Sequence, residues 1–591
     1  MLKIVTHAII VLFAVWFFLS GVKLPDQSET DFHLNEFAHL PVKYEGRKKP
    51  IDTLARNLLT VLSDKQTVRT AEGEKVSASQ WLIDNISGRP DALNYLVFRI
   101  ENMDVISSMG LKERKHFRYS YSEILPGIRH LDSAARSAYN KSEKQRDLYD
   151  KQVIKTANKF YLYQNVMSSF EDPTSLSKDE LLTASQRYMR LEKYSIPLVV
   201  SPSVDNPRWR PLMSSLLANH PDMKAMGNVD APDPMAVQFG MLLTAYREGN
   251  VELFNQTLDE YESRMVNERP GVMNELSFEI FYNRLGAFMK SAQLYLLVFL
   301  ISCFGWMARK RGPIDIALTL MVCAFIPHTF AIIARCFISG YPPVTNLYSS
   351  AIFIGWAAVL AGIVLELGYR KAEGMGNLAG SIAGFSTLLI AHFLAGDGDT
   401  IEQMRAVLDT RFWLTTHVIT ITLGYMATFV AGTIGVFYII AGLFTRRLDE
   451  TTNENLYRMM YGVTCFALLL SFVGTVLGGL WADDSWGRFW GWDPKENGAL
   501  LIVIWTAMML HARSGRMVAN RGFAVMAVAG NIVTAWSWFG VNQLNVGLHS
   551  YGFTSSATFW LLVFVVSQLL VIFAGIIPLQ AWRSGPEKPE A

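Results

Sequence analysis

The second half of this 591-residue chain is dominated by apolar stretches close to the length of a membrane helix. A helix needs about 20 consecutive apolar residues to cross the hydrocarbon layer. Nine such stretches follow one another at residues 292–308, 314–335, 348–367, 377–396, 413–443, 460–480, 498–511, 523–540 and 557–581. The stretch 498–511 is short and needs its flanks to span. Together with an apolar N-terminal segment, these stretches predict about ten membrane-spanning helices.

The first half of the chain divides into a short apolar part and a long polar part. Residues 1–20 carry one Lys before the run IIVLFAVWFFL, and no A-x-A cleavage site follows, so we expect an uncleaved anchor rather than a signal peptide. Residues 21–290 are polar and have no spanning run, and their periodic apolar positions are typical of helices. The expected fold is mainly α: a polytopic membrane helical bundle with a large, mainly helical extracytoplasmic domain.

The distribution of Lys and Arg between the helices predicts the orientation of the bundle, because cytoplasmic loops are enriched in these residues. One set of connections carries Arg309, Lys310, Arg311, Arg370, Lys371, Arg446, Arg447, Arg458, Arg513, Arg516, Arg521, Arg583 and Lys588. The opposite set carries only Arg335, Arg405, Arg411, Arg488 and Lys495. The richer set is therefore expected in the cytoplasm, which leaves a bundle at 291–582, a cytoplasmic tail at 583–591, and the 21–290 domain outside.

Composition excludes some classes of function. The net charge is only +2, so nothing indicates binding to nucleic acid. The four cysteines, Cys303, Cys323, Cys336 and Cys465, lie in or beside apolar stretches and form no CxxC pair. Neither a disulfide framework nor a thioredoxin-like redox role is therefore expected.

The stretch 481–496, WADDSWGRFWGWDPKE, contains four of the protein's 15 tryptophans: Trp481, Trp486, Trp490 and Trp492. It lies between two apolar stretches and is expected to be a loop at the membrane surface. One interpretation is an interfacial aromatic belt, but a belt needs scattered aromatic residues rather than a Trp-Asp-Pro-Lys-Glu sequence. We favour a flat apolar platform for a large planar ligand, because aromatic rings bury much area with few torsions to fix.

The segment WGRFWGWDPKENGAL resembles the tryptophan-rich "WWD" signature of heme-handling proteins, most closely the CcsA (ResC-type) family of cytochrome c synthase subunits. The resemblance covers about residues 292–582, with a weaker echo in PVKYEGRKKPIDTLAR at 41–56. It implies a protein of the bacterial inner (cytoplasmic) membrane that holds heme b at the outer face during cytochrome c maturation. It further implies a holocytochrome c synthase (heme lyase) that works with a CcsB (ResB)-like subunit and attaches heme to the CxxCH motif of apocytochrome c. Thiol-reducing pathway proteins are further candidate partners.

The resemblance also assigns roles to individual residues. His417 opens an apolar stretch longer than a membrane requires, which lifts it above the hydrocarbon, and the resemblance makes His417 and His549 the axial ligands of heme iron. It makes His511, at the cytoplasmic end of its helix, one ligand of an inner heme site that a CcsB-like partner completes. A lone histidine on the outer face is otherwise more often structural.

The remaining residues of the tryptophan stretch are expected to shape the site. Trp481, Trp486, Trp490 and Trp492 would carry the porphyrin, and Arg488 or Lys495 would pair with a propionate. Asp493 belongs to the same motif, but its position before Pro494 favours a cap on a helix that starts near Asn497. Glu496 is expected to form a surface ion pair with Lys495 or Arg488.

Two other functions stay open at this point. The chain could chaperone or export heme for a separate ligase. It could instead be a secondary transporter or a quinone-linked redox subunit, which would need a polar site near the membrane midplane. His328 and His392 are the only candidates for that site, and we interpret both as packing or hydrogen-bonding residues.

Overall fold

The computed structural model of the protein describes residues 2–22, 31–70, 73–173, 176–191, 194–202, 208–217, 220, 233–268, 271–369, 374–404, 409–544 and 555–584. The chain divides into two compact units, which are described separately. The bundle unit comprises Met1–Gly21, Leu285–Leu394 and Met404–Ala591. The polar unit comprises Val22–Arg284 and Ala395–Gln403.

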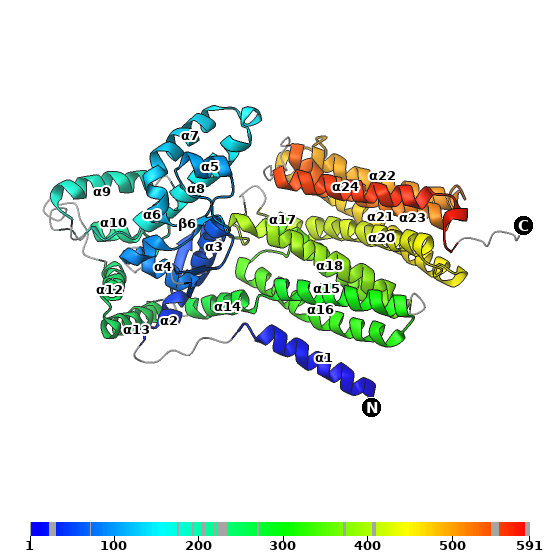
Figure 1. Ribbon diagram of the computed structural model, residues 1–591, viewed down its shortest axis with the longest axis horizontal. Coiled ribbons are helices and arrows are strands. Elements are labelled where there is room, and N and C mark those ends of the chain that lie inside the picture. The colour runs from blue at the N-terminus through cyan, green and yellow to red at the C-terminus, as the bar shows by residue number, and fades with distance from the viewer. Residues whose placement is uncertain are drawn as a thin grey trace, which may run out of the picture. The chain divides into compact units, whose positions relative to one another are not determined.

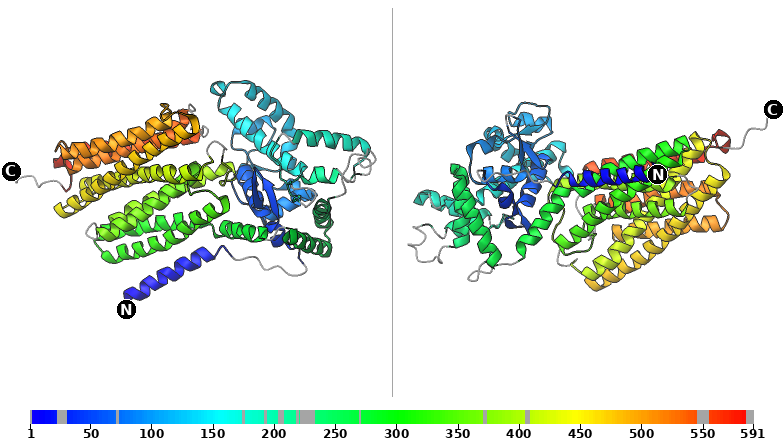
Figure 2. Two further views of the ribbon diagram at one scale, coloured as in Figure 1. Left: turned by 180° about the vertical axis from the view of Figure 1, so that it is seen from behind. Right: turned by 90° about the horizontal axis from the view of Figure 1, so that it is seen from below.

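The bundle unit consists of long helices that run side by side (Figures 1 and 2). Its main helices are α1 (Leu2–Leu19), α15 (Ala287–Ala308), α16 (Arg311–Ser339), α17 (Leu347–Gly368), α18 (Met375–Leu394), α20 (Ile419–Phe444), α21 (Glu450–Trp486), α22 (Pro494–Ser514), α23 (Asn520–Ala535) and α24 (Ser555–Ile576). Short turns extend two of them: α19 (Arg411–Trp413) and the π-turn η8 (Leu414–Val418) precede α20, and the π-turn η9 (Trp536–Gly540) and η10 (Val541–Leu544) follow α23.

Each of the ten predicted apolar segments forms a helix. Eight of the helices in the described residues are long and apolar enough to cross a membrane. The other two are α1, whose apolar part Lys3–Leu19 is shorter, and α22. Helix α22 has 21 residues, but charged residues occupy its first turn and basic residues its last, so its continuous apolar part is short. The prediction of a polytopic helical membrane protein is confirmed.

Close contacts between glycines hold α17 and α18 together. A Cβ atom added to Gly362 of α17 would lie 2.6 Å from the Gly376 carbonyl oxygen and 2.7 Å from the Gly380 Cα atom. Small residues at such positions let membrane helices approach closely without a hydrophobic driving force. His328, fully buried in α16, adds hydrogen-bond contacts to Tyr295 Oη of α15 (3.1 Å) and to the Ile352 carbonyl oxygen of α17 (3.2 Å). His328 is thus a hydrogen-bonding residue, as the sequence predicts.

In its described residues the polar unit is mainly helical and contains three two-stranded antiparallel sheets. The strands are β1 (Pro41–Tyr44) with β2 (Arg47–Pro50), β3 (Thr67–Arg69) with β4 (Lys75–Ser77), and β5 (Phe98–Arg99) with β6 (Arg118–Tyr119). Its helices are α2 (Leu34–His39), α3 (Ile51–Ser63), α4 (Ala78–Ile86), α5 (Met103–Ser108), α6 (Tyr121–Ile124), α7 (Ile128–Asn140), α8 (Leu148–Ser168), α9 (Lys178–Leu191), α10 (Leu212–Leu217), α12 (Pro234–Glu248), α13 (Val251–Glu268) and α14 (Val272–Leu285).

One segment of the polar unit comes from far along the chain. Residues Ala395–Gln403 follow α18 of the bundle, yet they pack within the polar unit. Their anchor is the Asp399 carboxylate, which accepts hydrogen bonds from Lys49 Nζ (2.6 Å) and Arg47 Nη2 (2.9 Å) of the β1–β2 hairpin. The segment 41–56, singled out in the sequence, therefore forms this hairpin and most of the first half of α3.

Candidate functional site

His417 lies in a π-helical turn rather than in the regular helix that follows it. The π-turn η8 spans Leu414–Val418 and leads directly into α20. π-Turns are rare in proteins and are frequent at functional sites. The Nδ1 atom of His417 is 2.8 Å from the carbonyl oxygen of Gly474 on α21. A carbonyl oxygen can only accept a hydrogen bond, so Nδ1 is the donor and carries the proton, and in the neutral imidazole Nε2 carries the lone pair.

The imidazole ring of His417 lies against one end of α21. Its centroid is 5.7 Å from that of Trp481, in an edge-on arrangement. A Cβ atom at Gly478 would be only 2.6 Å from His417 Cε1, so no larger residue fits there without movement. The structure therefore brings together two of the residues predicted for the site, His417 and Trp481.

The tryptophan stretch is not a loop along its whole length, which corrects the expectation for residues 481–496. Helix α21 continues through Trp481 and ends only at Trp486, where Gly487 takes the left-handed conformation (φ 67°). Such a glycine is a common helix terminator. The next helix, α22, begins at Pro494, three residues before the predicted start. Only residues 487–493 connect the two helices.

The connection folds back on α21 and leaves one indole on the surface. The Phe489 ring covers Gly479, where an added Cβ atom would be 2.6 Å from Phe489 Cζ. The Trp490 and Trp492 rings meet edge to face with centroids 6.1 Å apart. Trp492 has a left-handed backbone (φ 56°), which is unusual for a bulky residue and costs about 1–3 kcal/mol. Its side chain is 72% exposed.

The charged residues of the stretch mainly shape its backbone. Asp493 caps α22 by accepting from the backbone N–H of Lys495 (2.9 Å), as the sequence predicts. Glu496 accepts from the N–H groups of Gly491 (2.8 Å) and Asp493 (3.1 Å), so its carboxylate completes a capping box. The ammonium group of Lys495 donates to the Trp538 carbonyl oxygen at 2.9 Å.

Arg488 covers the peptide backbone of the same connection. Its guanidinium group occupies the space beside Gly491 where a Cβ atom would otherwise be, so a side chain at position 491 would displace it. Arg488 is half-buried in this position. A cation is thus held beside Gly491, in the connection that leads to α22.

The other two predicted histidines lie elsewhere. His511 is exposed in the last turn of α22, and its Nδ1 atom is 2.9 Å from the Ala507 carbonyl oxygen of the same helix. Because α22 has 21 residues, His511 is separated from the Trp492 end by roughly 30 Å at 1.5 Å per residue. His549 lies outside the described residues.

Two features of the site were not predicted from the sequence: the glycines of α21 and one polar contact. Gly478 accommodates His417 and Gly479 accommodates Phe489, while Gly474 leaves room for Ile421; the pair Gly478–Gly479 directly before Leu480 and Trp481 was the available signal. The polar contact is the hydrogen bond that Trp413 Nε1–H donates to Asp484 Oδ2 at 3.0 Å, and it joins α19, which precedes η8, to the end of α21.

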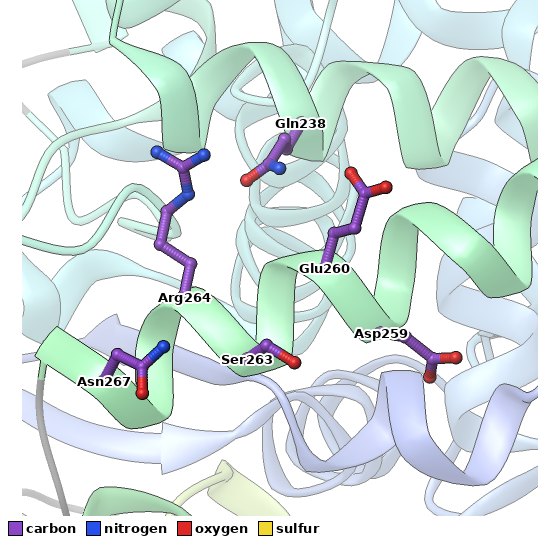
Figure 3. Close-up of a pocket in the computed structure, with 6 residues that line it drawn as sticks. All are labelled: Gln238, Asp259, Glu260, Ser263, Arg264 and Asn267. Carbon is purple, nitrogen blue, oxygen red and sulfur yellow. The ribbon is translucent and has the colours of Figure 1, made fainter.

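A polar hollow in the polar unit contains none of these residues. Gln238 of α12 and Asp259, Glu260, Ser263, Arg264 and Asn267 of α13 line it (Figure 3). The lining holds no histidine, cysteine or aromatic side chain, so the hollow offers neither an iron ligand nor a surface for a planar apolar molecule.

The chain is similar to proteins that act in cytochrome c assembly. The family model described as "Cytochrome C assembly protein" matches residues 344–549, the region that holds η8 and the tryptophan stretch. "Cytochrome c biogenesis protein CcsA" of Prochlorococcus marinus (strain NATL2A) is 30% identical over 298 residues, 44% of this chain and 92% of that one. The CcsA protein of Synechococcus sp. (strain CC9902) is 28% identical over 295 residues, 44% and 94% of the two chains.

A longer relative matches over only part of its length. "Protein NrfI" of Wolinella succinogenes is 29% identical over 313 residues, which is 50% of this chain but only 33% of NrfI. The match thus spans about a third of that relative. Since nearly the full length of the CcsA relatives is covered, at up to 30% identity, this chain belongs to the CcsA-type family of cytochrome c assembly proteins.

Proposed function

We propose that this protein holds heme at the outer face of the bacterial inner membrane and, with a CcsB-like partner, attaches it to the CxxCH motif of apocytochrome c. Heme is the substrate in this proposal. The observation that carries it is the pairing of His417 with the carbonyl of Gly474, beside Trp481 on the helix that leads to the exposed Trp492.

The chemistry of His417 fits a ligand of heme iron. Histidines that bind metals generally donate their other ring N–H to a carbonyl or carboxylate, which fixes the tautomer and raises the basicity of the ligating nitrogen. The Nδ1 contact with Gly474 is of this kind, so Nε2 is the atom that would bind iron. His549 is the proposed second ligand, carried over from the family resemblance.

The aromatic residues fit the porphyrin ring. Trp492 and Phe489 expose large apolar rings on a connection whose backbone is fixed by capping and by Gly479. Exposed apolar surface of this kind marks ligand or interaction sites. Trp481, Trp486 and Trp490 line the same end of α21 and the connection. Arg488, held beside Gly491, supplies a cation for a propionate.

The orientation is proposed from the distribution of basic residues and from helix alternation. The connections at the His511 end of the bundle carry most of the Lys and Arg residues, which favours the cytoplasmic side for that end. The chain leaves the polar unit at the N-terminal end of α15 and returns to it from the C-terminal end of α18. Alternating spans then assign the polar unit, His417 and Trp492 to the outer side. The exposed His511 would belong to an inner heme site completed by the partner.

Attachment requires little chemistry from this chain itself. Each cysteine thiol of apocytochrome c adds across one heme vinyl group: a C–S bond forms, and the thiol hydrogen ends on the neighbouring vinyl carbon. The addition consumes no oxidant, but the two thiols must arrive reduced. Because the cysteines in the described residues of this chain are dispersed among the apolar helices, both thiols come from apocytochrome c. The protein's part is to hold both reactants in a near-attack geometry.

The test is to express the chain with and without a CcsB-like subunit and an apocytochrome c, and to record the heme spectrum of the purified protein. We expect a six-coordinate heme spectrum, altered in His417→Ala, and covalent cytochrome c only when all components are present. If the protein retained heme but no combination of components produced covalent cytochrome c, the result would favour the alternative function of a heme chaperone. A protein that is free of heme under ample heme supply would refute the proposal.

A further inference from the structure

Three groups on one stripe of α21 surround the His417 ring. The Gly474 carbonyl oxygen accepts from Nδ1, Gly478 leaves the space that the ring fills, and the Trp481 indole packs against the ring. These residues are spaced by four and three positions, so they lie on the same face of the helix. The stripe therefore forms the surface on which the ring docks.

Gly478 differs from other glycines of the same helix in what surrounds it. An added Cβ atom would lie 2.6 Å from His417 Cε1, 3.1 Å from Nδ1 and 3.2 Å from Nε2, so it would collide with the ring itself. At Gly462, also on α21, an added Cβ atom meets nothing within 4 Å. The position of the His417 ring therefore requires glycine at 478, whereas position 462 has room for a side chain.

We propose that Gly478 is a positioning residue for heme ligation: it lets His417 dock on α21 so that Nδ1 is fixed by the Gly474 carbonyl and Nε2 is directed to the iron. This inference rests on the proposed function and adds the residue that sets the ligand's geometry. The π-turn η8 also contributes to the orientation of His417, because its wider turn rotates this residue relative to the regular spacing of α20.

A methyl group at position 478 must displace the imidazole. The ring then loses its hydrogen bond to Gly474, its packing on Trp481 or the direction of Nε2, and each loss weakens the iron bond. Removing the support of a metal-binding histidine typically reduces metal affinity roughly 10–100-fold. The side chain of His417 remains present, so the defect is one of orientation.

The experiment compares Gly478→Ala with Gly462→Ala in the full-length protein. Heme content, the reduced absorption spectrum and the midpoint potential are measured on purified protein, with cytochrome c formation as a separate readout. Gly478→Ala is expected to lose heme roughly 10–100-fold more readily and to shift the spectrum and potential. Millimolar free imidazole is expected to restore the spectrum, while Gly462→Ala behaves as the wild type.

A double-mutant cycle with His417→Ala separates positioning from folding. If Gly478 acts through the ring, Gly478→Ala adds no further loss of heme in the His417→Ala background, and it is tolerated there because the clash is gone. A Gly478→Ala protein with wild-type heme affinity, spectrum and potential would overturn the inference, as would an equal loss in both backgrounds or a double variant that fails to fold. If His417→Ala itself leaves the spectrum unchanged, the proposed function fails instead.

Discussion

Lys49 and Asp399 are 350 positions apart in the sequence, yet their side chains form an ion pair with an N–O distance of 2.6 Å. The Lys49 side chain is 1% exposed and that of Asp399 is 8% exposed. Arg47 bridges Asp399 to Glu279 of α14, and Glu279 also accepts from the hydroxyl of Thr53. Burial raises the pKa of Asp399, but Arg47 and Lys49 outweigh this effect and hold the pKa below its usual value.

The first prediction concerns this buried cluster. Lys49→Met leaves two buried carboxylates facing one guanidinium, and breaking a buried pair in this way costs about 3–5 kcal/mol. Lys49→Met/Asp399→Asn restores the charge balance, so it should cost less than the sum of the single changes. The measurement is thermal unfolding of the full-length protein, with proteolysis within 395–403 as a local readout. Asp64→Asn, which breaks the surface pair with Arg99, serves as the control and should cost less than about 1 kcal/mol. Additive effects of the two cluster changes would contradict the coupling.

The lengths of the apolar runs predicted the membrane helices, because a segment that crosses lipid must satisfy its own backbone hydrogen bonds and a helix does so. The cap at Asp493 was also predictable, since an acidic residue before proline and three residues before Glu496 is a local signal. Both features depend on neighbours within one element. The roles of His417 and Trp492, by contrast, come from the family resemblance rather than from a local pattern, and they stay predictions.

Other features depended on pairings that no local pattern specifies. The end of α21 at Trp486 was missed because Ala, Asp and Trp do not interrupt a helix, whereas Gly487 does. The docking of Asp399 on Lys49 joins segments that only the folded chain brings together. The π-turn at His417 has no distinctive composition. The role of Gly478 can be inferred only when the position of the neighbouring His417 ring is known.

The second prediction is a pH dependence in the polar unit. Burial, together with Glu36 and Asp259, raises the pKa of Glu262 from 4.5 to about 7. Between these values the folded state retains a proton that the unfolded chain has lost, so the contribution of Glu262 to stability falls as the pH rises from 4.5 to 7. Glu262→Gln should therefore raise the unfolding temperature at pH 8 and leave it unchanged at pH 4.5. The gain should be less than about 1 kcal/mol, because the group is partly exposed to solvent.

The control for this pH dependence is Glu252→Gln, which changes an exposed carboxylate on the same helix, α13. Unfolding is followed in the full-length protein at both pH values. A stabilisation by Glu262→Gln that is equal at pH 4.5 and pH 8 would show that titration of Glu262 is not its source.

The third prediction distinguishes a functional exposed tryptophan from a lipid-facing one. Trp492 is 72% exposed and Trp560 of α24 is 66% exposed, so neither truncation removes much packing. Trp492→Ala is expected to leave the unfolding temperature nearly unchanged but to lower the heme content of the purified protein several-fold. The reason is that a contact between two aromatic rings is worth about 1 kcal/mol. Trp560→Ala should leave the heme content unchanged. Equal heme content in the two variants would remove Trp492 from the proposed site.

The last prediction separates a structural histidine from a ligand. His328 is fully buried and joins α15, α16 and α17 through Tyr295 Oη and the Ile352 carbonyl oxygen. His328→Phe leaves both partners without this contact and is expected to destabilise the bundle by about 1–2 kcal/mol. The heme spectrum should be unaltered, since the three-helix contact of His328 does not include His417. The half-buried His417 should give the reverse result in His417→Phe: a small change in unfolding temperature and loss of the six-coordinate spectrum. If His328→Phe changed the spectrum in the folded protein, His328 would have to be counted among the groups that act on heme.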